Sequence, residues 1–151
     1  MPLGLVVTVF VWTIGLSLRH LAQFSVSVVV NAREPQLGLW FGTDLSGTPA
    51  LIASVIGVVC SLMLFRLADP AGYVATVGLG LFTGGAASNT TERLWFASVV
   101  DYVPVPGTDG ILANFGDVAL TAGFALFAVS VIRFHLARVI AASWARRFEP
   151  R

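Results

Sequence analysis

Two aspartates stand out in this chain because each of them lies in an apolar stretch. Asp117 is followed at once by the apolar run VALTAGFALFAVSVI (118–132), and Asp101 lies within VVDYV (99–103). A carboxylate at the mouth of a membrane helix is costly to keep there, and such residues usually mark functional sites. Two carboxyl groups that come together share one proton. Such a pair can take a proton from water and give one to a leaving group, as acid–base hydrolysis requires.

Each polar residue near these aspartates also has a purely structural explanation. Asp101 fits a solvated loop residue, and Asp117 fits the first turn of a helix, which favours carboxylates. Asn114 lies three residues before Asp117, so both share a helix face, and Asn114 fits a helix cap. Asn89 and Arg93 are four apart and share a face if their helix continues that far. Arg93 then fixes a turn, or contacts a lipid head group or a substrate carbonyl.

The composition is that of an integral membrane protein. Apolar residues make up 56% of the 151 residues and charged residues 11%, against about 25% in typical soluble domains. Crossing about 30 Å of hydrocarbon takes roughly 20 helical residues. We therefore predict one membrane domain over residues 1–151, with spans at about 2–21, 49–67, 70–89 and 113–134.

The third predicted span has two distinctive features. Pro70 is placed at its first position, where the missing N–H is tolerated. The span is also rich in Gly, Ala and Ser, which let membrane helices approach one another closely. We expect these small residues to serve helix packing.

Two polar pieces separate the spans, at 24–48 and 90–112. The sequence FSVSVVV (24–30) alternates with period two and is rich in β-branched residues, which predicts a strand. An exposed sheet edge cannot lie in hydrocarbon, so this strand must rest above the membrane core. Prolines and glycines keep residues 102–110 non-helical. The predicted fold is an all-α membrane protein with four transmembrane helices and a small extracytoplasmic β/loop insert between the first and second spans.

Arginines set the expected topology. They gather at the C-terminal end, at Arg133, Arg138, Arg146, Arg147 and Arg151. Positive charges near span ends favour the cytoplasmic side. With four spans, both termini and the tail 135–151 are then expected in the cytoplasm, and the pieces 24–48 and 90–112 outside.

The polar motifs resemble those of the lipoprotein signal peptidase family, signal peptidase II. That family carries Asn-x-x-Asp-Arg, Val-Val-Asp-Phe and Asn-x-Ala-Asp runs in this order. This chain has Asn89 with Glu92-Arg93, then VVDY (99–102) and NFGD (114–117), and the spacing from Asn89 to Asp101 matches without a gap. The resemblance implies a membrane aspartic endopeptidase with Asp101 and Asp117 as the catalytic pair. Its substrates would be diacylglyceryl-modified prolipoproteins, cut just before the lipidated cysteine to remove the signal peptide.

The resemblance also assigns the surrounding residues. It implies that Asn89, Arg93 and Asn114 line the site and hold substrate, and that Asn31 matches an asparagine beside a small outer sheet. It further implies a bacterial cytoplasmic membrane, an active site at the outer face, and prolipoproteins and lipids as partners of a monomer.

This chain departs from the family pattern at several points. Glu92 stands where the family usually has Asp, and Gly116 where it usually has Ala, which we expect to be a mild change. The first span lacks the acidic and lysine residues common in the family, and Ala32-Arg33 does not continue the pattern at Asn31. These departures leave open a divergent, non-catalytic four-helix protein that binds lipid or lipoprotein.

Other chemistries find little support in the sequence. One cysteine and two distant histidines do not suggest a metal cluster, and we expect neither a metal nor another cofactor. Nucleic-acid binding lacks a basic patch outside the C-terminal tail.

Overall fold

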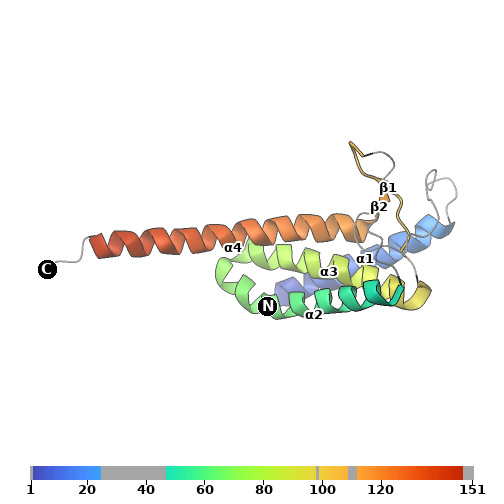
Figure 1. Ribbon diagram of the computed structural model, residues 1–151, viewed down its shortest axis with the longest axis horizontal. Coiled ribbons are helices and arrows are strands. Elements are labelled where there is room, and N and C mark those ends of the chain that lie inside the picture. The colour runs from blue at the N-terminus through green and yellow to red at the C-terminus, as the bar shows by residue number, and fades with distance from the viewer. Residues whose placement is uncertain (1, 25–46, 98, 109–111, 148–151) are drawn as a thin grey trace.

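The computed structural model describes residues 2–24, 47–97, 99–108 and 112–147. These form four helices, with a short strand pair between the third and fourth (Figure 1). The elements are α1 (Pro2–Phe24), α2 (Gly47–Ala71), α3 (Tyr73–Phe96), β1 (Val103–Pro104), β2 (Leu112–Ala113) and α4 (Phe115–Arg147). The two strands are antiparallel, with Val103 opposite Ala113. The predicted all-helical class is confirmed.

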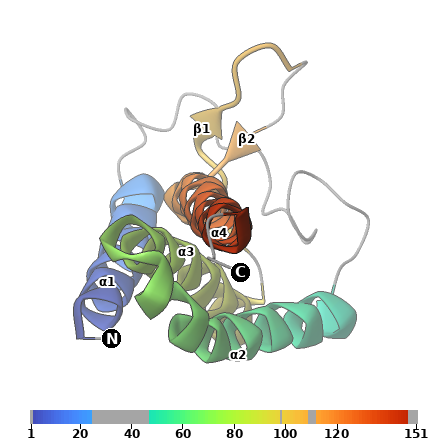
Figure 2. The same ribbon diagram turned by 90° about the vertical axis from the view of Figure 1, so that its left-hand side faces the viewer.

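Helix α3 is the centre of the bundle and packs against α1, α2 and α4 (Figure 2). The helices alternate in direction, so the end of α1, the start of α2, the end of α3 and the start of α4 lie at the same end of the bundle (Figure 1). The strand pair lies at this end too. The polar residues singled out in the sequence are therefore brought together by helix ends from distant parts of the chain.

Small residues on α3 allow these close helix contacts. A Cβ atom on Gly78 would lie 2.7 Å from the backbone nitrogen of Phe127 in α4, and one on Gly84 would lie 2.7 Å from the carbonyl oxygen of Thr8 in α1. A Cβ on Gly85 would collide with the carbonyl oxygen of Gly116. Real side chains do not fit at such distances, so the small residues serve packing, as expected.

The boundaries of the third helix differ from the prediction at both ends. Pro70 belongs to the last turn of α2, and the break falls at Gly72, whose φ of 96° suits glycine. At the other end α3 continues through Phe96, past the predicted end at residue 89. Its polar last turns stay helical because Asn89, Thr90 and Glu92 are buried against the neighbouring elements.

Three helices are long and apolar enough to cross a membrane, over Leu3–Ala22, Thr48–Arg66 and Phe115–Trp144. Helix α4 has 33 residues, which is about 50 Å of helix, and its C-terminal half runs beyond the other three helices (Figure 1). The region predicted as a cytoplasmic tail is thus helical as far as Arg147. Phe24, the first residue of the strand predicted at 24–30, is helical and ends α1. The rest of that predicted strand and the candidate residue Asn31 lie outside the described residues.

Candidate active site

The start of α4 explains the spacing of Asn114 and Asp117. The side-chain oxygen of Asn114 accepts the backbone N–H of Asp117 at 2.9 Å, and the Asp117 carboxylate accepts the backbone N–H of Asn114 at 3.4 Å. This is a capping box, in which two residues three apart satisfy each other's free amides at a helix start. The cap fixes both side chains, and both are buried.

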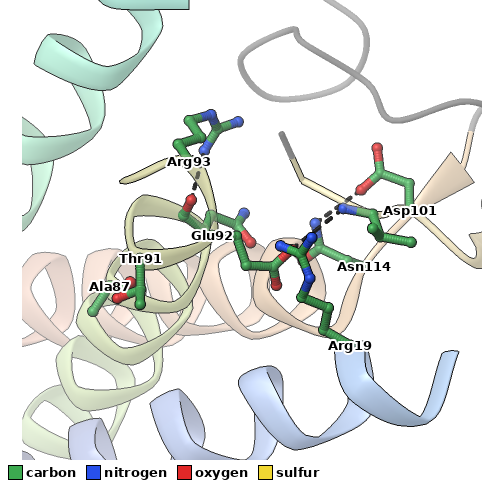
Figure 3. A network of polar contacts seen from close by, with 9 residues as sticks. Arg19, Ala87, Thr91, Glu92, Arg93, Asp101 and Asn114 are labelled. Atoms are coloured by element: carbon green, nitrogen blue, oxygen red, sulfur yellow. Dashed lines mark hydrogen bonds and ion pairs between the residues drawn. The ribbon is translucent and has the colours of Figure 1, made fainter. Parts of the chain in front are cut away.

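Asn114 joins the two aspartates. Because its oxygen faces the amide of Asp117, its NH2 group points the other way and donates to Oδ1 of Asp101 at 2.8 Å (Figure 3). One side chain therefore contacts the helix-borne aspartate and the loop-borne aspartate at once. The sequence alone allows Asp101 to be an exposed loop residue. In the structure Asp101 is half-buried and lies near the start of α4.

The segment before α4 positions Asp101 through its backbone. Helix α3 ends at Ala97, which adopts a left-handed conformation with φ 56° and donates its N–H to the Arg93 carbonyl. Val99 is buried, which turns the chain back onto the bundle. Tyr102 donates its N–H to the Ala113 carbonyl at 2.9 Å, and its hydroxyl accepts the N–H of Phe115 at 3.3 Å. These contacts tie the Asp101 segment to the start of α4.

Asn89 and Arg93 approach from the last turns of α3. The amide of Asn89 donates to Oδ1 of Asp117 at 2.7 Å. The guanidinium of Arg93 lies 3.4 Å from both Ser54 Oγ of α2 and the Asn89 carbonyl oxygen. Helix α3 continues past Arg93, so Asn89 and Arg93 share a helix face. Arg93 reaches from α3 to Ser54 of α2, and its positive charge acts on both Asp101 and Asp117.

A cavity of about 190 Å³ lies beside these groups, between α2, α3 and α4. Its lining is apolar along most of its length and polar at one end, with residues Ala53, Ser54, Gly57, Phe82, Ala86, Asn89, Arg93, Asp117 and Leu120. Asp117 is in the wall of the cavity, whereas Asp101 is not among the lining residues and is linked to Asp117 through Asn114. The cavity offers an apolar chain a place to lie, with a carboxyl group beside it.

The surroundings of Asp101 favour its protonated form. Burial raises the pKa of the Asp101 carboxyl to about 6, and the negative charge of Asp117 acts in the same direction. The hydrogen bond from Asn114 and the positive charge of Arg93 oppose that rise in pKa without cancelling it. Asp101 therefore exchanges its proton closer to neutral pH than an ordinary aspartate does, and such shifts are common at functional sites.

A second buried acid near the aspartates was not singled out by the sequence. Glu92 Oε2 lies 3.1 Å from Nη1 of Arg19 (Figure 3). The guanidinium of Arg19 stacks 3.7 Å from the centroid of the Phe96 ring. Both charged side chains are almost fully buried. The available signal is that Arg19 and Glu92 are opposite charges near the same end of two neighbouring helices.

The structure brings five of the six predicted site residues to one place. Asp101, Asp117, Asn114, Asn89 and Arg93 lie within one network of contacts, and Asn31 is outside the described residues. Among the described residues, no group of three or more histidine, cysteine and acidic side chains is placed to hold a metal ion. The groups gathered here are suited to moving protons and binding amides.

An apolar bundle that carries two linked aspartates at one end defines a class, namely an integral membrane protein with a candidate carboxyl-pair site. Comparison with known sequences gives the family. The profile of Peptidase_A8, signal peptidase (SPase) II, matches residues 22–133. The chain belongs to the signal peptidase II family, as its motifs indicated.

Individual relatives agree. The lipoprotein signal peptidase of Nitrobacter hamburgensis is 37% identical over 91 residues, covering 56% of this chain and 55% of that protein. The lipoprotein signal peptidase of Geobacillus kaustophilus is 35% identical over 85 residues, covering 55% of each. This chain thus spans about half the length of the curated relatives that it matches.

Solved structures share the fold. A bacterial membrane enzyme solved by the in meso method at 2.3 Å resolution superposes with a TM-score of 0.74 at 19% identity, covering 88% of this chain and 89% of that one. A second, solved at 1.9 Å, gives a TM-score of 0.69 at 21% identity, over 87% of this chain and 93% of that one. At these identities the match concerns the arrangement of helices.

Proposed function

We propose that this chain is an aspartic endopeptidase of the membrane that removes the signal peptide from diacylglyceryl-modified prolipoproteins. Asp101 and Asp117 are the catalytic pair and share one proton. The ionised member takes a proton from water as that water attacks the scissile carbonyl, and the protonated member protonates the carbonyl oxygen or the leaving amine. The peptide bond breaks into an acid and an amine, and the pair is left with one proton again.

The observation that carries this proposal is the contact of Asn114 with both aspartates. Its amide donates to Asp101 at 2.8 Å, and its oxygen accepts the N–H of Asp117 at 2.9 Å. The two aspartates are 16 positions apart in the chain, and the capped helix start links them through Asn114. Surface aspartates in a loop and a helix start would not need a buried asparagine between them.

The site also suits a substrate that stays in the bilayer. The apolar part of the cavity runs along α3 from Phe82 to Ala86 and ends at Asn89, Arg93 and Asp117. A signal peptide would lie along the apolar part, with its scissile bond at the polar end and its lipid in the surrounding membrane. Asn89 and Arg93 would hold the peptide backbone, and Asn114 would keep Asp101 in place.

The topology follows from the same arrangement. We infer that α3 is a fourth span, since it runs between three helices that are apolar enough to cross a membrane. The end of the bundle with the aspartates then faces outward and meets water, and the arginine-rich end of α4 lies in the cytoplasm. Residues 24–48 and 90–112 are on the outer side. We expect a monomer.

Cleavage of a lipidated prolipoprotein peptide by the purified chain in detergent tests the proposal. We expect cleavage just before the lipidated cysteine and little cleavage of the same peptide without lipid. Asp101→Asn and Asp117→Asn should each lower kcat by about 1,000-fold or more, with the protein still folded and inserted. Full activity of both variants would contradict the mechanism. Binding of the lipidated peptide without any cleavage by the wild-type chain would favour a non-catalytic lipoprotein-binding protein.

A further inference from the structure

The buried pair of Arg19 and Glu92 ends next to the aspartate segment. The carboxylate oxygen Oε2 of Glu92 lies 3.1 Å from Arg19 Nη1 and 3.3 Å from the backbone nitrogen of Val100. Val100 immediately precedes Asp101. One carboxylate oxygen therefore links a side chain of α1 to the peptide unit beside a predicted catalytic residue.

We propose that Glu92, held by Arg19, is a positioning residue that fixes the backbone on which Asp101 is carried. This inference rests on the proposed function, in which Asp101 is catalytic. Among the described hydrogen bonds, Glu92 reaches the Asp101 segment through the N–H of Val100.

The Asp101 backbone is held on both sides. On one side Val100 donates to Glu92 at 3.3 Å, and on the other Tyr102 donates to the Ala113 carbonyl at 2.9 Å. The second contact belongs to the strand pair and positions Asp101 relative to α4. The first positions it relative to α3 and α1. Without it, the turn that starts at Ala97 would lose the hydrogen bond that ties it to the end of α3.

The ion pair explains how Glu92 can remain an acceptor at a buried position. A carboxylate accepts an N–H strongly only in its ionised form, and a buried negative charge needs a partner. Arg19 supplies that charge and is itself held against the Phe96 ring at 3.7 Å. An apolar pair of similar volume often packs with equal or greater stability. Stability alone therefore does not require the ion pair. The pair is required to keep a buried acceptor for the N–H of Val100.

Two double variants separate positioning from stability. Both carry Arg19→Met, so that no charge is left buried. One adds Glu92→Gln, which keeps an oxygen for the Val100 N–H, and the other adds Glu92→Met, which has the same length and no such oxygen. Trp12→Phe serves as a control, since it removes another contact between α1 and α3, the 3.0 Å hydrogen bond to Thr91.

The Gln variant should keep kcat within about threefold of wild type, and the Met variant should lose about 10- to 100-fold in kcat with little change in KM, as expected when a reacting group is misplaced. Trp12→Phe should keep wild-type kcat. Hydrogen exchange at Val100 should be fast in the Met variant and slow in the Gln variant. Equal kcat in the two folded double variants would overturn the proposal.

Hydrogen exchange keeps the test independent of the proposed function. If the wild-type chain cleaves no lipidated peptide, the proposed function fails, while the exchange comparison still reports whether Glu92 holds the Asp101 segment. If the double variants do not fold, the wild-type protein decides the question. Slow exchange of the Val100 amide supports the anchor, and exchange as fast as in an unstructured peptide overturns it.

Discussion

The two acidic clusters at the end of the bundle are held in different ways. Glu92 is bound by the guanidinium of Arg19, whereas Asp101 and Asp117 accept hydrogen bonds from the amide groups of Asn114 and Asn89. The charge of the Arg19 guanidinium favours the ionised form of Glu92 and opposes the rise in its pKa to about 7 that burial causes. An amide donor positions a carboxylate without adding a full charge, so that the carboxyl group can still gain a proton.

The two neighbouring acidic clusters are therefore suited to different roles, one structural and one in proton transfer. The charged pair fixes the end of α3 and the backbone before Asp101. The amide-bound pair has its geometry fixed and its protonation left variable, which is what a general acid and base require. Substitutions in the amide cluster should have the largest effect at the asparagine that joins the aspartates, a smaller effect on its packing, and the smallest on its charge.

The largest effect is expected at Asn114. Asn114→Asp keeps an oxygen for the Asp117 N–H and so preserves the helix cap, but it replaces the donor to Asp101 by a repelling oxygen. We expect kcat/KM to fall by about 100-fold or more, with a melting temperature close to that of the wild type, measured on the lipidated peptide and by thermal unfolding. Wild-type activity in this variant would show that the link to Asp101 has no role in catalysis.

A smaller effect is expected where the asparagines pack. A Cβ on Gly116 would lie 2.5 Å from Asn89 Oδ1 and 2.8 Å from Asn114 Oδ1. Gly116 therefore lies in a crowded site. From the family pattern, which usually has Ala at this position, we expect only a mild difference between Gly and Ala. Gly116→Ala should lower kcat/KM by about 3- to 10-fold, because overpacking displaces the side chains. Val118→Ala, at an exposed neighbouring position, is the control and should leave activity unchanged. Equal activities of the two variants would contradict the crowding argument.

The smallest effect concerns stability and pH. The pKa of Asp101 is raised from an ordinary 3.8 to about 6 in the folded protein, so folding favours its protonated form. The corresponding stability is present below pH 3.8 and is lost as pH rises through 6. Asp101→Asn cannot ionise and should melt a few degrees higher than wild type at pH 7.5, with the difference vanishing near pH 4. A variant that melts lower than wild type at pH 7.5 would argue against the cost of ionising Asp101.

The sequence predicts the helices well and their polar ends poorly. Apolar runs of sufficient length identify α1, α2 and α4, since hydrophobicity decides which residues enter the membrane. The sequence leaves the end of α3 open, because Asn89 to Arg93 look like a loop by polarity. They remain helical because Asp117, Arg19 and Ser54 on three other helices supply their partners. Such partners cannot be read from a local window of sequence.

The site shows the same limit. The motif NFGD (114–117) contains the capping box within four residues, so its geometry follows from spacing. The contact of Asn114 with Asp101 and that of Glu92 with Val100 depend on how two turns fold back onto the bundle. Gly72, where α2 and α3 separate, illustrates a third case, since its positive φ rather than Pro70 sets the break.

The pH dependence of kcat/KM on the lipidated peptide tests the shared proton most directly. The apparent pKa values belong to the pair rather than to either residue. We expect activity to rise at acid pH as the first proton leaves the pair, and to fall through about pH 6 as the second is lost, because the Asp101 pKa is raised to about 6 beside ionised Asp117. A bell-shaped profile with its falling limb near pH 6 would support the account. A profile that stays flat from pH 4 to 9 would contradict it.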